Sequence, residues 1–84
     1  MPDNDFRNIV TGCCRDAGLE IGTFVVRDES ILDCLAAGGP DAAPIGSSVI
    51  QRAAWNLTRW LGVDVAGVRL PGGTIRFTGP GLRA

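Results

Sequence analysis

The residues best suited to binding chemistry in this 84-residue chain are Arg52, Trp55 and Arg59, which lie on one predicted helix. Helical side chains spaced three and four residues apart are neighbours, so an arginine can lie over the indole ring. Such a cation–π contact contributes roughly 0.5–2 kcal/mol. Trp and Arg are also enriched among the residues that dominate binding energy at protein interfaces. The pattern therefore predicts a binding surface on this helix.

Catalytic chemistry has little support in the composition. The chain contains no His, no Lys and no Tyr, and all eight of its cations are Arg. His is the commonest general base and metal ligand, and Lys supplies Schiff-base chemistry. Ser30, Ser47 and Ser48 lack a histidine to activate them and suit helix caps instead. We expect no enzymatic activity, no cofactor and no metal.

The three cysteines, Cys13, Cys14 and Cys34, are an odd number and form no Cys-x-x-Cys pair. A complete disulfide framework and a zinc site are therefore both disfavoured, and we expect reduced thiols that pack as small apolar side chains on helices. The acidic start of the chain is unlike a signal peptide, and no apolar run reaches the ~18–20 residues of a membrane span. These features predict a cytoplasmic protein without a membrane segment.

Composition and length predict one compact domain over residues 1–84. The apolar share is 45%, the charged share is 20% and the formal net charge is −1, which suits a folded core. The charge is unevenly distributed. Residues 1–47 hold three arginines and eight acids, a net −5, whereas residues 48–84 hold five arginines and one acid, a net +4. This asymmetry indicates either that the two halves pack together or that a basic face meets an acidic partner.

The first half predicts a helix, a strand and a second helix. Asp3 or Asn4 caps a helix that ends at Gly18, and a strand follows over residues 19–27. The buried stripe of the first helix is Phe6, Ile9, Val10, Cys13 and Ala17. The segment Asp28-Glu29-Ser30 caps the second helix, in which Ser30 and Asp33 resemble a capping box.

The second helix is predicted to bury Ile31, Cys34 and Leu35 and to end at Gly38-Gly39-Pro40. A loop over residues 40–47 follows, and we expect its Ile45 to be buried.

The clearest helix starts at Ser48, which forms a capping box with Gln51, and ends at Gly62. Its predicted buried side consists of Ile50, Ala53, Ala54, Leu57 and Leu61. Its predicted polar side consists of Gln51, Arg52, Trp55, Asn56 and Arg59. The sequence leaves open whether Trp55 is exposed or covered by the N-terminal segment or the 40–47 loop.

The last segment predicts a β-hairpin with a three-residue turn, Pro71-Gly72-Gly73. Its predicted core face is Val68, Leu70, Ile75 and Phe77, which leaves Arg69 and Arg76 outside. The resulting fold class is α+β, in the order α-β-α-α-β-β, with three helices packed on a small antiparallel sheet.

Two functions fit these features. The first is a non-catalytic protein-interaction module whose helix 48–61 docks on an acidic protein surface. Its predicted partner-binding residues are Gln51, Arg52, Trp55, Asn56, Arg59, Arg69 and Arg76. A small arginine-rich, lysine-free chain of this kind suits a bacterium or phage, for example as an inhibitor of a host system of the anti-CRISPR type.

The second function is DNA binding, because the element order is that of winged-helix domains. On that analogy helix 48–61 enters the major groove, and the hairpin bearing Arg69 and Arg76 is the wing. The sequence does not decide between protein and nucleic acid as partner, and it leaves a homodimer open.

Overall fold

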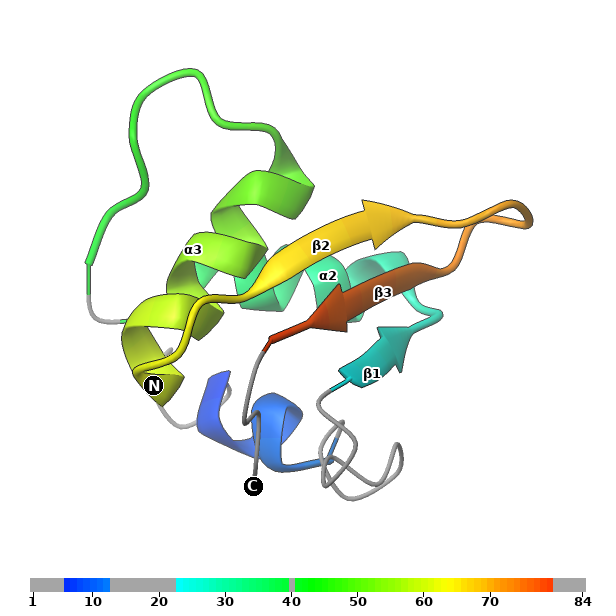
Figure 1. Cartoon of the computed structure of the whole chain (residues 1–84), viewed down its shortest axis with the longest axis horizontal. Coiled ribbons are helices and arrows are strands. Elements are labelled where there is room, and N and C mark those ends of the chain that lie inside the picture. Colours follow the sequence, from blue (N-terminus) through cyan, green and yellow to red (C-terminus); the bar gives the residue numbers. More distant parts are fainter. Residues whose placement is uncertain (1–5, 13–22, 40, 80–84) are drawn as a thin grey trace.

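The computed structural model describes residues 6–12, 23–39 and 41–79, which form helices packed against one antiparallel sheet (Figure 1). A first helix occupies residues 6–12. The elements after it are β1 (Thr23–Val26), α2 (Glu29–Ala37), α3 (Val49–Leu61), β2 (Ala66–Arg69) and β3 (Ile75–Thr78). The predicted α+β class and the order α-β-α-α-β-β are confirmed.

The first helix packs its predicted stripe inward, since Phe6 and Val10 are buried and Ile9 is half-buried. The ring of Phe6 lies edge-on to Trp60 of α3, with centroids 5.5 Å apart. Phe6 also lies so close to Gly38 that a side chain at that glycine would overlap it. The predicted Cys13, Ala17 and Gly18 positions, and residues 19–22 of the predicted strand, lie outside the described residues.

Helix α2 begins two residues earlier than the predicted capping box. Its N-cap is Asp28, whose carboxylate accepts hydrogen bonds from the backbone N–H and the hydroxyl of Ser30. The predicted Ser30–Asp33 box is therefore wrong, because Ser30 already lies inside the helix. Gly38 ends α2 as predicted, and its N–H donates to the carbonyl of Cys34.

The buried side of α2 carries Leu32 and Leu35. Cys34 is exposed, so its predicted inward packing is wrong. The reason is helical geometry, because Cys34 lies about 200° around the helix from Leu32.

Helix α3 follows its prediction closely. Ser48 and Gln51 form the reciprocal capping box, with bonds of 3.1 and 2.8 Å, and Gly62 ends the helix at a φ of 75°. Ala53, Ala54 and Leu57 are buried. These residues face α2 and the sheet, whereas Gln51, Arg52 and Arg59 are exposed.

The sheet has the strand order β1-β3-β2, and both neighbouring pairs are antiparallel. Helices α2 and α3 cover one face of it (Figure 1). Ile75 and Phe77 of β3 are buried. Strand β2 comes so close to α3 that a Cβ at Gly67 would lie 2.8 Å from a methyl group of Ile50. Only glycine fits there without displacement.

The predicted three-residue hairpin turn is confirmed. The N–H of Leu70 donates to the carbonyl of Thr74 at 2.7 Å, and that of Gly73 donates to the carbonyl of Leu70 at 3.1 Å. Gly72 has a φ of 93°, which explains the glycine in this turn.

The predicted core face of the hairpin is wrong at Val68. The register places Val68 opposite Arg76 and Arg69 opposite Ile75. Residues directly opposite point to the same face of a sheet, so Val68 lies on the outer face, 54% exposed. By the same register Arg69 lies on the helix side of the sheet and not outside it.

Candidate functional site

The loop that joins α2 to α3 runs along the polar side of α3. Gly39 lies so close to Asn56 that a Cβ there would be 2.8 Å from the Cβ of Asn56. Asp41 lies 4.0 Å from Nε of Arg59. At its other end, the carbonyl of Ser47 accepts a 2.8 Å hydrogen bond from Nη1 of Arg52. These contacts join the two ends of the loop to α3, and Figure 1 shows the loop between them as an arch that stands out from the helix.

Trp55 and Arg59 form the predicted stacked pair. The guanidinium carbon of Arg59 lies 4.4 Å from the centroid of the indole ring. Trp55 is half-buried, and its Nε1 is buried with no hydrogen-bond partner among the described residues. The question that the sequence left open is thus answered: the indole is neither fully exposed nor fully covered.

Arg52 does not join the stack on Trp55 but holds a turn of the loop. The turn is closed by Ser47, whose N–H and hydroxyl both donate to the carbonyl of Pro44, at 3.2 and 2.8 Å. Gly46 supplies the required positive φ of 91°. We call residues 44–47 the loop turn.

Ile45 projects from the loop turn and is fully exposed. The prediction that it is buried is wrong, because the turn directs its side chain away from the rest of the protein. No pattern in the sequence marks this isoleucine as exposed, although Pro44 and the Gly46-Ser47 pair do mark a turn.

Asn56 is not part of the outward surface. It is only 3% exposed, and its Nδ2 donates to the carbonyls of Leu35 and Ala36, at 2.8 and 3.0 Å. Its predicted exposed position is therefore wrong. The last carbonyls of α2 lack helical partners, and the Asn56 amide satisfies two of them. The sequence did contain a signal for this burial, because the amide side chain of Asn56 lies next to the apolar residues of α3.

Gln51 is exposed, but its side-chain oxygen already accepts the N–H of Ser48 in the capping box. It stabilises the start of α3 and has its amide nitrogen left for other contacts.

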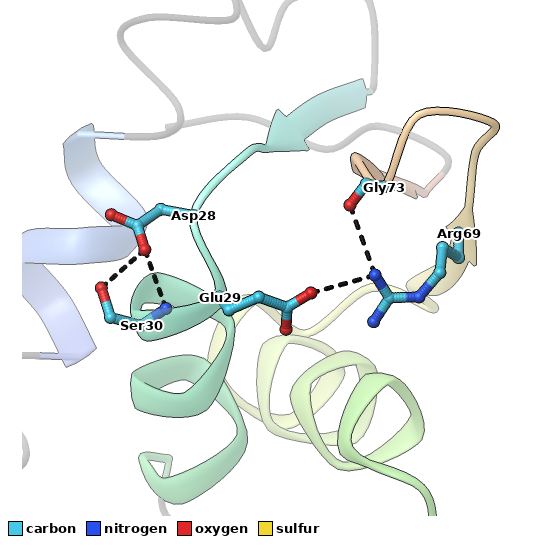
Figure 2. A network of polar contacts seen from close by, with 5 residues as sticks. All are labelled: Asp28, Glu29, Ser30, Arg69 and Gly73. Atoms are coloured by element: carbon cyan, nitrogen blue, oxygen red, sulfur yellow. Dashed lines mark hydrogen bonds and ion pairs between the residues drawn. The ribbon is translucent and has the colours of Figure 1, made fainter.

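Arg69 and Arg76 lie apart from the polar side of α3. Nη1 of Arg69 bonds Oε1 of Glu29 at 3.0 Å and the carbonyl of Gly73 at 3.3 Å, so it joins the hairpin to the start of α2 (Figure 2). Arg76 is exposed on the outer face of the sheet, and its guanidinium has no ion pair or hydrogen bond within the described part of the chain. The seven predicted residues therefore do not form one site.

Asp28 is the one described group whose acidity departs clearly from normal. The Ser30 hydroxyl, followed by the Ser30 backbone N–H, stabilises the carboxylate and lowers the pKa of Asp28 below its usual 3.8. This shift is explained by helix capping and does not mark a reactive centre.

The described residues contain no group of three or more His, Cys, Asp and Glu placed to hold a metal ion. Within the same residues, no helix combines the length and apolar character needed to cross a bilayer. Comparison with protein-family models, with curated proteins and with solved structures finds no match to this chain. What the geometry assembles is a surface of Arg52, Trp55 and Arg59, which we call the α3 surface.

Proposed function

We propose that this protein is a small non-catalytic interaction module that docks the α3 surface on an acidic surface of another protein. The observation that carries the proposal is the stack of Arg59 on Trp55, with Arg52 held one turn away on the same helix. Trp and Arg together are the composition expected at the energetic centre of a protein interface.

The geometry favours carboxylates as the groups recognised. A guanidinium that stacks on an indole, as that of Arg59 does on Trp55, leaves N–H groups to bind a carboxylate with two parallel hydrogen bonds. Arg59 is already oriented, so less side-chain entropy is lost on binding. Its contact with Asp41 is long, at 4.0 Å, and both side chains are about half or more exposed, so this ion pair is weak.

The charge around the start of α3 supports the same choice. The first turn of α3 contains no acidic residue, whereas the first turn of α2 contains Glu29. The N-terminus of a helix carries a partial positive charge. At α3 this charge adds to that of Arg52, and no carboxylate in the first turn offsets it.

DNA binding by α3 is the alternative, supported by the winged-helix element order and by the exposed Arg76 on the hairpin. It has weaker support at the helix itself. Asn56, a residue type that reads adenine, is buried and bonded to α2. The loop also lies along the side of α3 that would have to enter the groove.

A cytoplasmic inhibitor from a phage or mobile element is the setting that we propose for such a module. It is supported by the small size of the chain and by its use of arginine without lysine.

Two measurements test the proposal. The first is fluorescence anisotropy with a labelled random-sequence DNA duplex at about 50 and 200 mM salt. DNA binding that weakens by orders of magnitude over this range would favour the alternative. We expect no binding at either salt concentration.

The second is selection of antibody fragments with randomised loops against the wild-type chain. Selected paratopes are expected to be rich in Asp and Glu and to lose binding to the double variant R52E/R59E. The charge-matched control is R27E/R76E, which alters two exposed arginines outside the α3 surface. Equal loss with both double variants would contradict the proposal.

A further inference from the structure

We propose that Ile45 is an apolar anchor that enters an apolar pocket, bordered by carboxylates, on the protein that the α3 surface binds. This inference rests on the proposed function and deepens it, because it assigns the loop turn a direct part in recognition and specifies the shape of the partner.

The local structure explains every residue of the loop turn except Ile45. The carbonyl of Pro44 accepts both bonds from Ser47, and Gly46 adopts a φ that other residues rarely adopt. Ile45 closes no bond and is fully exposed. Turn positions usually carry Gly, Pro, Asn, Asp or Ser. An isoleucine is not required by this turn and, being fully exposed, adds no buried contact to the fold.

The loop turn is joined to α3 by one side-chain hydrogen bond. Nη1 of Arg52 donates to the carbonyl of Ser47 at 2.8 Å, directly after the turn closes. This bond limits the positions that the loop turn can adopt before a partner arrives, which lowers the entropy lost on binding. Pro44, which directly precedes Ile45 in the chain, is also exposed.

The charged groups beside the loop define the partner's chemistry. The loop that carries Ile45 contacts Arg52 at one end and Arg59 at the other, so the apolar tip lies on the segment that joins the two guanidinium groups. An apolar centre with a charged rim is the usual anatomy of a specific interface. The complementary surface is an apolar pocket with Asp or Glu side chains at its border.

The variant Ile45→Ser tests this anchor, with Val68→Ser as the matched control. Val68 is the other large apolar side chain that is exposed among the described residues, and it lies on the outer face of the sheet. Both variants should unfold at the wild-type temperature, because Ile45 is fully exposed and Val68 is more than half exposed.

Binding of the selected antibody fragments is then measured by interferometry on each variant. We expect Ile45→Ser to weaken binding about 10- to 100-fold and Val68→Ser to change it by less than about threefold. If R52E/R59E loses binding but Ile45→Ser does not, docking through the α3 surface is supported and the proposal that Ile45 is an anchor is contradicted. If only Ile45→Ser loses binding, the helix part of the proposed function is wrong.

Sedimentation equilibrium of the wild-type chain and of Ile45→Ser provides a second test. We expect both to be monomeric at micromolar concentration. A dimer that Ile45→Ser abolishes would make a second copy of this chain the occupant and would overturn the acidic pocket.

Discussion

The protein contains two turns with similar hydrogen bonds, one before α3 and one between β2 and β3. The side chains that they expose are different. Each turn is closed by an N–H that donates to a carbonyl three residues earlier, Ser47 to Pro44 and Gly73 to Leu70. In each, an arginine Nη1 donates to the carbonyl of the last turn residue: Arg52 at 2.8 Å and Arg69 at 3.3 Å. Each turn lies beside the N-terminus of a helix, α3 for the first and α2 for the second.

The two turns differ in whether their arginine has an acidic partner and in which side chains they expose. Arg69 forms an ion pair with Glu29, so its charge is balanced by a carboxylate of the same chain (Figure 2). Arg52 has no acidic partner among the described residues. The hairpin turn presents Pro71 and Gly72, whereas the loop turn presents Ile45. One turn thus completes the fold, and the other displays an apolar side chain beside an available positive charge.

The largest expected effect comes from the core that supports both turns. Leu57→Ala should lower the free energy of unfolding by about 2–5 kcal/mol, because Leu57 is fully buried in α3 and its loss leaves a cavity. Chemical denaturation measures the change. Ile45→Ala removes a side chain of similar size from full exposure and should be close to neutral. A near-neutral Leu57→Ala would contradict the orientation of α3.

The glycines that shape the loop and the hairpin should rank in a defined order. Gly46→Ala and Gly72→Ala should each cost roughly 1–2 kcal/mol, since both residues have a positive φ and open space around them. Gly39→Ala should cost more, because it adds a contact of 2.8 Å with Asn56 to the same strain. Denaturation midpoints give the ranking. Equal losses at all three positions would show that the loop moves away from α3 readily.

The two arginines should respond differently to salt. A double-mutant cycle with Glu29→Gln and Arg69→Ala should give a coupling energy of about 0.2–1 kcal/mol that falls towards zero at about 1 M salt. The loss caused by Arg52→Ala should change little with salt, because its partner is a neutral carbonyl. A strong salt dependence at Arg52 would reveal an acidic partner within the fold.

The smallest expected effect distinguishes the two helix caps by pH. The folded-state pKa of Asp28 is lowered, so the stability that its carboxylate contributes is present above about 3.8, the usual value, and is lost as the pH falls through the lowered pKa. The Ser48 cap does not titrate in this range. Thermal unfolding between about pH 5 and pH 2 should therefore be less acid-sensitive in Asp28→Asn than in the wild type. Ser48→Ala should keep the wild-type slope, and an unchanged slope in Asp28→Asn would contradict the assignment.

The sequence predicted those parts of the molecule that depend on neighbours in the chain. The capping box of Ser48 and Gln51, the end of α3 at Gly62 and the three-residue hairpin turn are local, and each was correct. The stack of Arg59 on Trp55 is also local, since it joins positions four residues apart.

The errors concern residues whose surroundings come from distant segments. Asn56 is buried because α2, about 20 residues earlier, ends against it. Val68 is exposed because the hairpin register places it opposite Arg76, and a shift of one residue reverses the face of every side chain. Ile45 is apolar yet fully exposed, and residue type alone does not predict this because apolar residues are also found on surfaces.

The strand order has a consequence for how the chain is made. β3 is the central strand, yet it follows both of its neighbours in the sequence. Neither ladder can form until residues 75–78 have left the ribosome, so the apolar residues of α2 and α3 have no sheet to cover them before then. Val26 pairs in the sheet with Ile75, which lies about 50 residues later in the chain. Pairing at such a sequence separation slows folding and prolongs exposure of apolar surface. A chaperone that recognises exposed apolar segments would therefore bind this chain before the hairpin emerges.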